Sequence, residues 1–456
     1  MMLNFKLNKL KLSNYREFGN INIDFHPEMT VLVARNGGGK TAVLDAIAVA
    51  FGPFIGAFSD GHGVHFRVSD IRQSLNLGGK EIEFHTPLKM EASGIIGEKK
   101  LEWTRELSGK KSRTTISGAR NLITCARELE ARISKEKKTV LPLFAYYGTG
   151  RLWKTIKLTE GKAKASKRRA RVAGYMDCLD PASSYNAAAD WMYYAYMRNV
   201  ESFLEDETAG KQSAPYEAEI EAIVEATNIC LRHSGRKNLR YTIQYGELTL
   251  WHDEFGRLPV SYLSDGIRNI VGLALDIAYR AAKLNAWMGN CCVAETPGIV
   301  MIDEVDMHLH PSWQQEVLPR LSEAFPLVQF IVTTHSPQVL TTVKPECIRI
   351  ISVEDKEDGK YNVIIPPFSL GAESNLVLEM VQNVLARPSQ LPIVRKLHQY
   401  LKLVNSDQWD SSDALKLRKD LDEWGAGHEP VLAKTDVDIR VREYRREQVV
   451  RRNEKN

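Results

Sequence analysis

The sequence predicts an α/β fold in which helices flank a mixed β-sheet core, and three segments support this prediction. Met29–Val33 is an apolar run of strand length, and the helix-forming segment Thr41–Val49 follows it after a Gly-Gly-Gly turn. Pro297–Val305 and Phe330–Thr334 are two further apolar runs, each leading into polar residues. Buried strands joined to helices in this way are typical of α/β proteins.

The turn between the first strand and its helix predicts a phosphate-binding loop. Val31–Thr41 reads VLVARNGGGKT and follows the GxxxxGK[ST] pattern, except that Ala34 occupies the first glycine position. Backbone N–H groups of such a turn, together with the helix N-terminus, hold the β- and γ-phosphates of a nucleotide. We therefore expect ATP with Mg²⁺ to bind here, with contacts from Arg35, Asn36, Gly37, Gly38, Gly39, Lys40, Thr41 and Ala42.

The second apolar run predicts the rest of the catalytic centre. It ends in Asp303 and Glu304, and a strand that delivers an acidic pair completes the metal site of P-loop proteins. We expect Thr41 and Asp303 to hold Mg²⁺, and Glu304 to act as the base toward water. The third run ends at His335, which we expect to sense the γ-phosphate, while Lys40 neutralises phosphate charge.

A fourth motif precedes the predicted helix Asn269–Ala282. Tyr262–Arg268 reads YLSDGIR and resembles the LSGGQ signature of ABC-type ATPases, with Asp265 and Ile267 as departures. In that superfamily, the signature of one subunit contacts the γ-phosphate held by another. The resemblance therefore implies that two protomers sandwich nucleotides head to tail, with contacts from Ser264, Asp265 and Gly266.

The order of these motifs resembles the RecF/SMC/OLD-like branch of ABC ATPases. The segments that carry the resemblance are Asn14-Tyr15-Arg16, ARNGGGKT, LSDGIR, IDEVDMHLHPSWQ and TTHSPQ. Three further segments, AYYGTGRLW, GYMDCLDP and SLGAESN, are similar to the PtuA-type ATPase subunits of Septu and certain retron anti-phage systems. The resemblance covers residues 1–390 and implies an ABC/SMC-type P-loop ATPase head with Arg16 near the nucleotide.

The resemblance implies that the protein is an ATPase, with either brisk or slow turnover, in a bacterial anti-phage defence complex. This subunit would scaffold and regulate a PtuB-like HNH endonuclease partner, which cuts the DNA, through nucleotide-sandwiched dimers and higher oligomers. The alternative is a RecF/SMC-like ATP-dependent DNA clamp or repair factor without a nuclease. An OLD-type nuclease is disfavoured. The candidate for its metal-binding acidic segment, Val353–Gly359, is better interpreted as a charged turn.

Composition is compatible with a cytoplasmic enzyme. No apolar run approaches the roughly 20 residues that a membrane helix needs, and the six cysteines lack metal-ligand spacing. The net charge of +4 is too small to indicate nucleic-acid binding. DNA binding rests instead on two basic segments, Lys162–Arg171 and Arg440–Lys455, for which a solvated loop and tail are equally good interpretations.

The motifs divide the chain into four expected regions. Residues 1–151 form the first ATPase lobe, 152–237 a helical insertion, 238–368 the second lobe with signature, acidic strand and histidine, and 369–456 a helical region with a basic tail. Lys80–Phe84 and Lys100–Leu107 alternate like strands and are expected to form an antiparallel β flap. Asn238–Leu250 is expected to form a strand pair, and Gln73 is the positional candidate for a Q-loop glutamine.

Overall fold

The computed structural model describes residues 4–75, 81–136, 138–150, 171–182, 185–209, 214–355 and 358–453. The chain forms two compact units, Met1–Gln382 and Asn383–Asn456. The first unit, here called the catalytic unit, holds the phosphate loop, the signature segment, the acidic pair and His335, whereas the basic segment Arg440–Lys455 belongs to the second unit. The basic segment Lys162–Arg171 lies outside the described residues except for Arg171.

The catalytic unit is built on a ten-stranded mixed sheet, as the sequence predicted. The strand order is β7-β6-β1-β2-β15-β14-β3-β13-β12-β8. Their bounds are β1 Asn4–Tyr15, β2 Phe18–Asp24, β3 Met29–Val33, β6 Leu88–Gly97, β7 Lys99–Leu107, β8 Leu143–Tyr147, β12 Gly298–Ile302, β13 Val328–Thr333, β14 Ile348–Asp355 and β15 Lys360–Ile364.

Four neighbouring strands, β3, β13, β12 and β8, run parallel to one another. Every residue of these strands is buried, which explains why they read as continuous apolar runs rather than alternating ones. Helix α1, Lys40–Ile55, follows β3 directly and buries most of its residues. Because the strands run the same way, the residues after β3, β12 and β13 meet at one edge of the sheet.

The antiparallel part of the sheet differs in detail from the expected flap. The two predicted segments exist as strands but do not pair with each other: β7 pairs with β6, while β5 (Ile82–Phe84) pairs with β4 (Gln73–Leu75) in a separate two-stranded sheet. Strand β6 pairs with β1 on one side and with β7 on the other. Its buried residues alternate regularly with half-buried ones. Helix α2, Arg120–Lys135, follows β7 in the chain.

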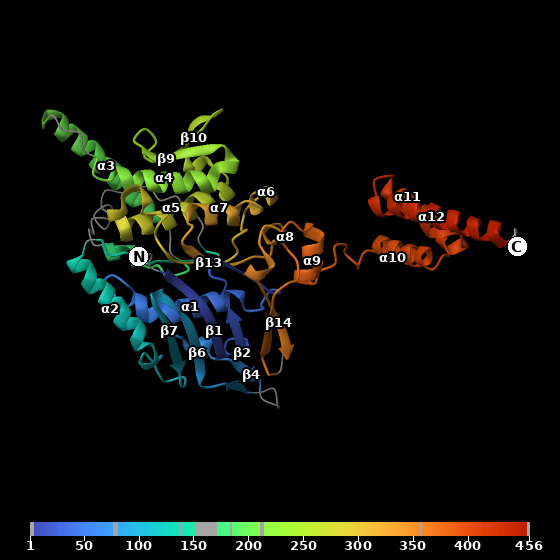
Figure 1. The fold of residues 1–456 in the computed structure, drawn as a ribbon, viewed down its shortest axis with the longest axis horizontal. Helices are drawn as coiled ribbons and strands as arrows, with labels where there is room; N and C mark the ends of the chain where they lie inside the picture. The colour runs from blue at the N-terminus through green and yellow to red at the C-terminus, as the bar shows by residue number, and fades with distance from the viewer. Residues whose placement is uncertain are drawn as a thin grey trace. The chain divides into compact units, whose positions relative to one another are not determined.

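A helical layer and a small sheet complete the catalytic unit. Helices α3, Asn186–Ala209, and α4, Glu217–Leu231, form the predicted helical segment, and α4 contacts helix α5, Asp265–Asn285. The expected strand pair is present and has a third strand, giving the order β11-β10-β9. In Figure 1 this sheet and α4 lie on the opposite side of the unit from β4. The small-sheet bounds are β9 Arg236–Thr242, β10 Glu247–His252 and β11 Gly256–Pro259.

Short helices carry the chain from the acidic strand to the end of the catalytic unit. They are α6 Pro311–Gln314, α7 Val317–Ala324, α8 Pro337–Leu340 and α9 Ser374–Gln382. The second unit contains α10 Pro392–Asn405, α11 Ser412–Gly425 and α12 Pro430–Asn453. These helices surround a core of their own, which includes Leu397, Tyr400, Trp409 and Leu421.

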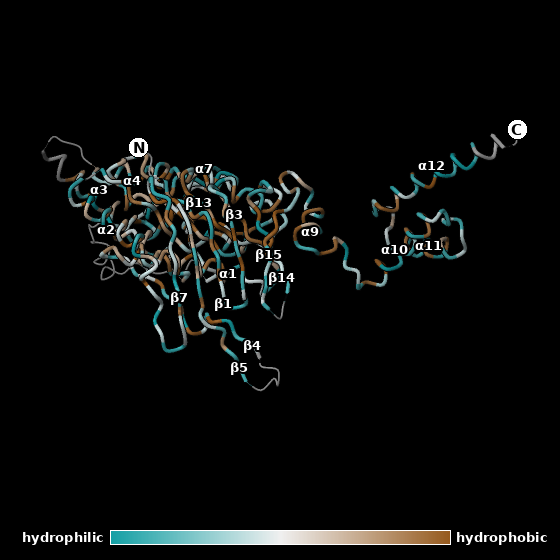
Figure 2. The backbone as a smooth tube through the Cα atoms, turned by 60° about the horizontal axis from the view of Figure 1, so that its bottom comes forward, coloured by the Kyte–Doolittle hydropathy of each residue, from teal (hydrophilic) through white to brown (hydrophobic). Residues whose placement is uncertain are grey.

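Hydropathy follows this organisation. Figure 2 shows hydrophobic residues concentrated along the central strands of the catalytic unit. Within the described parts of the chain, no helix combines the length and the apolar character needed to cross a bilayer.

Candidate nucleotide site

The phosphate loop lies between β3 and α1, where the sequence predicted it. Gly37 and Gly39 have positive φ values of 74° and 87°, and Gly39 is the N-cap of α1. A Cβ atom at Gly39 would come within 2.1 Å of Phe18 Cζ, so neither the backbone conformation nor the space permits another residue. The N–H of Gly38 donates to the carbonyl of Arg35 at 2.9 Å, which closes the turn. The loop thus presents backbone donors at a helix N-terminus, as an anion requires.

The departure at Ala34 has a structural counterpart. Ala34 is buried, and its carbonyl accepts a hydrogen bond from Lys40 Nζ at 3.3 Å. A Cβ at Gly38 would lie 2.8 Å from the Ala34 Cβ. The alanine methyl therefore fits because Gly38 faces it. Arg35 and Asn36 are exposed at the tip of the loop, Thr41 is exposed at the start of α1, and Ala42 is buried behind it.

Lys40 and His335 contact each other although 295 positions separate them. The distance between Lys40 Nζ and His335 Nε2 is 2.5 Å. Burial, and after it the Lys40 ammonium, lowers the pKa of His335, so the imidazole is neutral near pH 7 and its Nε2 accepts from the ammonium. Burial also lowers the pKa of Lys40, against the opposing effect of Asp303 and neighbouring carboxylates.

The acidic pair lies beside the helix N-terminus. Thr41 donates its hydroxyl to Asp303 Oδ2 at 2.8 Å. Thr333, the last residue of β13, donates to Asp303 Oδ1 at 2.6 Å and accepts from the backbone N–H of Glu304 at 2.7 Å. Glu304 has a positive φ of 47°, an unusual conformation for a residue other than glycine. Strain of this kind is concentrated at functional sites.

These residues fit a magnesium nucleotide. Mg²⁺ in nucleotide sites is commonly held by one or two protein oxygens together with substrate phosphates and water. Thr41 Oγ1 and Asp303 Oδ2 supply such a pair next to the phosphate loop. No group of three or more His, Cys, Asp and Glu residues with metal-binding arrangement occurs among the described residues, so a metal cage built from protein alone is not found there.

A second layer of hydrogen bonds fixes the loops that carry Glu304 and His335. Thr334 donates to Asp306 at 2.5 Å, and Ser336 donates to Gln314 Oε1 at 2.7 Å. Gln382, in α9, donates to the His335 carbonyl at 2.7 Å. Sequence reasoning missed these positioning residues. The TTHS segment offered a signal, because polar side chains at the end of a buried strand need partners.

The signature segment forms the N-terminus of α5. Ser264 is the N-cap, yet its hydroxyl makes no capping hydrogen bond, and both Ser264 and Asp265 are exposed. Gly266 lies against the loop that follows Glu304, since a Cβ there would come within 2.6 Å of the His308 carbonyl oxygen. Asn269 donates to the Met307 carbonyl at 3.2 Å. The signature helix is therefore attached to the same loop as the acidic pair, while its polar tip faces outward.

A buried polar network that the sequence did not reveal links α5 to β8. Tyr147, at the end of β8, donates its hydroxyl to Asp276 Oδ2 at 2.7 Å, and Arg280 Nε donates to the same oxygen at 2.8 Å. Burial, followed by the Asp276 carboxylate, raises the pKa of Tyr147 well above its ordinary value. The Tyr147 carbonyl also accepts from the backbone N–H of Asp303 at 2.8 Å. One residue thus contacts both the signature helix and the acidic strand.

Arg16 lies in the turn between β1 and β2. Its guanidinium pairs with Asp45 of α1 at 2.7 Å and with Asp70 at 2.9 Å. Asp45 also accepts a hydrogen bond from the Tyr146 hydroxyl at 2.7 Å. Because Asp45 is four residues after Thr41, Arg16 lies beside the first turns of α1 rather than among the loop N–H groups.

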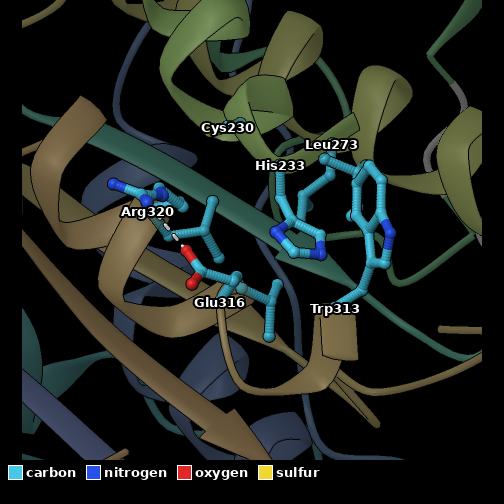
Figure 3. A pocket seen from close by; sticks show the side chains of 9 residues that line it. Cys230, His233, Leu273, Trp313, Glu316 and Arg320 are labelled. Atoms are coloured by element: carbon cyan, nitrogen blue, oxygen red, sulfur yellow. Dashed lines mark ion pairs between the residues drawn. The ribbon is translucent and has the colours of Figure 1, made fainter. Parts of the chain in front are cut away.

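A pocket lies away from this site, between helices α4, α5, α6 and α7 (Figure 3). None of the phosphate-loop residues lines it. Figure 3 shows the His233 and Trp313 rings on one side and the Glu316–Arg320 ion pair, at 2.8 Å, on the other. The pocket is therefore separate from the nucleotide site.

Comparisons with known proteins agree with the motifs. Residues 9–230 match a family described as an AAA domain, and residues 187–340 match an AAA ATPase domain. The retron Vc95 probable ATPase of Vibrio cholerae is 25% identical over 91% of this chain and 86% of its own length. The retron Ec83 probable ATPase of Escherichia coli is 39% identical over 41% of this chain, and the match spans only 33% of that relative.

The comparisons also include a Septu protein and a solved structure. A Septu protein PtuA of Bacillus mycoides is 42% identical over 21% of this chain and 13% of its own length. Among solved structures, an SMC head bound to the C-winged helix domain of ScpA matches with a TM-score of 0.46 and 16% identity, covering 79% of this chain and 97% of that one.

Proposed function

We propose that this chain, which belongs to the PtuA-type ATPases of the RecF/SMC/OLD-like branch, is the ATP-hydrolysing subunit of a multi-component bacterial defence system. The observation that carries the proposal is the convergence of Lys40, Thr41, Asp303 and His335, which come from three neighbouring parallel strands. Such convergence at the carboxyl edge of a sheet is where α/β proteins bind ligands.

The proposed chemistry is attack of water on the γ-phosphate of ATP. Glu304, half-buried at the end of the acidic strand, takes the proton from water. Lys40 and the loop N–H groups stabilise negative charge on the phosphate oxygens. His335 reports the γ-phosphate, because a third phosphate competes for the Lys40 ammonium that the imidazole holds. Mg²⁺, held by Thr41 and Asp303, would supply further charge neutralisation when bound.

The proposed assembly is a dimer in which nucleotides are sandwiched, with higher oligomers built from it. Ser264 is exposed, and its hydroxyl makes no capping hydrogen bond to helix α5. This supports the arrangement, since the hydroxyl can contact a phosphate bound by a second protomer. Asp265 and Gly266 would approach with it. We further propose, from the relatives named Septu PtuA and retron ATPase, that the assembly scaffolds an HNH endonuclease partner that cleaves DNA under nucleotide control.

The test compares Glu304→Gln with the wild-type chain. The substitution keeps the size of the side chain and removes the base, so we expect hydrolysis to fall by about 10²- to 10⁴-fold while ATP remains bound. Sizing with light scattering should show a larger species with ATP than without it, and Glu304→Gln should retain that species for longer. Glu225→Gln, an exposed glutamate of α4, is the matched control and should behave as wild type.

Lys40→Ala provides the complementary result in the same assay. It should lose ATP binding and the ATP-dependent increase in mass, whereas exposed Lys100→Ala should keep both. Unchanged ATP affinity in Lys40→Ala contradicts the site, and equal mass with and without ATP contradicts the sandwich. Co-expression with neighbouring genes separates the two functional hypotheses: a stoichiometric HNH protein supports the nuclease scaffold, whereas an ATPase that captures DNA alone supports a RecF-like clamp.

A further inference from the structure

The outer face of the three-stranded sheet β9–β10–β11 has the composition of a nucleic-acid-binding surface. The inner face, with Leu239, Leu248 and Leu250, is buried, and β9 contacts α4. The register places Arg240 and Pro259 opposite Thr249, and Lys237 and Arg257 opposite Trp251. Cross-strand partners share a face, so Lys237, Arg240, Arg257 and Trp251 all lie on the outer side. We call these four residues the basic sheet face.

The charges of this face are only partly neutralised. Arg240 is exposed, and no carboxylate pairs with it among the residues that the structure describes. Arg257 donates to the Asn238 carbonyl and to the Thr249 hydroxyl, both at 3.1 Å, and neither acceptor is charged. Burial, and then the nearby Arg240, lowers the pKa of Arg257, as expected for two guanidinium groups without an anion between them.

The carboxylates near this face are engaged at its margins. Asp253 pairs with Lys237 at 3.0 Å and accepts from Trp251 Nε1 at 3.1 Å. Glu247 accepts from the Ser261 hydroxyl at 2.7 Å. Glu254 is exposed in the turn beside Asp253. Among the described residues, the two arginines therefore have no carboxylate partner, and the acidic groups lie at the two ends of β10.

An aromatic ring accompanies the arginines. Trp251 is 39% exposed although it is in the middle strand of the sheet, and Asp253 fixes one edge of its indole. The hairpin tips add Tyr245 at one end, 42% exposed, and Phe255 at the other, 63% exposed. Single-stranded nucleic acids bind surfaces on which bases stack on aromatic rings while basic groups contact the phosphates.

From these observations we propose that the basic sheet face binds single-stranded nucleic acid, with a base stacked on Trp251 and phosphates held by Arg240 and Arg257. The strand β9 spans seven residues, or about 20 Å, which accommodates a short stretch of an extended single strand. A duplex fits less well, because its bases are already stacked on one another and cannot cover the indole. The proposal is independent of the nucleotide site, which lies at the edge of a different sheet.

The test measures fluorescence anisotropy of labelled oligo(dT) and oligo(rU), about 12 nucleotides long, with the full-length chain. We expect both to bind, with affinity falling as salt rises. Trp251→Ala and Arg240→Glu should each weaken binding by about tenfold or more, and Trp251→Phe should restore most of the loss because a phenyl ring still stacks. Arg240→Glu should also reduce the slope of log K against log salt by about 0.7, as for one lost phosphate contact.

Arg127→Glu is the matched control. It makes the same charge change at an exposed position of α2, so it should bind oligonucleotides as wild type does. All variants should bind ATP with wild-type affinity, which shows that they are folded. Quenching of tryptophan fluorescence by the oligonucleotide, lost in Trp251→Phe, reports the stacking contact directly.

The outcomes are distinct. Preference for oligo(dT) or for oligo(rU) supports the proposal and shows that the surface distinguishes the two polymers, which differ at the 2′ position of the sugar and at the C5 methyl group of the base. Failure of the wild-type chain to bind either one at low salt overturns it. Tighter binding of a duplex, or of an acidic peptide, with no loss in Trp251→Ala also overturns it, because stacking would then contribute nothing.

Discussion

At the scale of single residues, Thr333 is the side chain that organises the acidic pair. Its hydroxyl donates to Asp303 and accepts from the N–H of Glu304, so one oxygen fixes both residues. Thr333 is fully buried, and its backbone belongs to β13 rather than to the acidic strand. A side chain from the neighbouring strand therefore holds the positive φ of Glu304 in place.

Thr333→Val tests this role with nearly unchanged side-chain volume. The variant removes the hydrogen bond to Asp303 Oδ1 and the hydroxyl that accepts from the Glu304 N–H, so we expect a loss of about 1–3 kcal/mol in the free energy of unfolding. ATP hydrolysis should fall more than ATP binding, because Glu304 loses its position. Chemical denaturation and steady-state kinetics measure the two effects.

The comparison for this variant is Thr124→Val. Thr124 lies exposed on α2, and its hydroxyl donates to the Arg120 carbonyl at 3.0 Å. Its substitution should leave both stability and turnover unchanged. If Thr333→Val hydrolyses ATP at the wild-type rate, the hydroxyl does not position Glu304.

Residues with a role in a local motif could be predicted from the sequence, while residues that act across strands could not. Lys40, Thr41, Asp303 and His335 were proposed because each follows a recognisable strand at a fixed offset, and the structure places them close together. Thr333 belongs to the same TTHS segment as His335, but its contact with Asp303 depends on β13 lying beside β12. The order of parallel strands in space is not encoded in local spacing, so such partners remained hidden.

At the scale of elements, the signature helix α5 and the loop after the acidic pair form one assembly. Gly266 lies directly on the carbonyl of His308, and Asn269 bonds to the carbonyl of Met307. At the far side of the helix, Asp276 binds Tyr147 of β8. Helix α5 is thus held at two levels, and its exposed tip at Ser264 is fixed relative to Glu304.

Gly266→Ala should disturb this contact. The new Cβ would come within 2.6 Å of the His308 carbonyl oxygen, a backbone atom that cannot rotate away. We expect the free energy of unfolding to fall by about 1–3 kcal/mol, as in other overpacked sites, and ATP-dependent dimers to weaken because the helix tip shifts. Thermal unfolding and sizing with ATP measure these changes.

Gly109→Ala is the appropriate comparison, since nothing lies within 4 Å of a Cβ at that position. It should unfold and assemble as wild type does. If Gly266→Ala is as stable as wild type, the loop at His308 moves to accommodate the new methyl group, and the loop and helix α5 do not form one assembly.

The sequence predicted most elements because buried strands and amphipathic helices leave strong patterns. Strand β3 begins and ends at its predicted residues, and α5 contains its predicted helix. The two strands predicted for the antiparallel flap are present, but their partners β4 and β6 were not identified from the sequence. An alternating pattern of apolar and polar residues shows where a strand lies in the sequence, but it does not show which strand pairs with it.

At the scale of the whole molecule, the chain has two units with separate cores. The core of the second unit includes Leu397, Tyr400 and Leu421, and the ion pair between Arg387 and Glu429, at 2.7 Å, forms within that unit. Two independent cores predict two unfolding events, since each compact unit with a core of its own can unfold cooperatively by itself.

Ending the chain after Gln382 tests this independence. The shortened chain keeps all the candidate nucleotide residues, so we expect it to fold and to bind ATP within about twofold of the full chain. Calorimetry should show one transition in place of two. A shortened chain that fails to fold would show that the catalytic unit needs the second unit.

Gln382 lies at the boundary between the two units and also contacts the candidate nucleotide site. Its amide holds the carbonyl of His335, and the very next residue, Asn383, begins the second unit. Replacing Gln382 therefore removes a hydrogen bond to the residue that we propose senses the γ-phosphate, although Gln382 itself is the last residue of the catalytic unit.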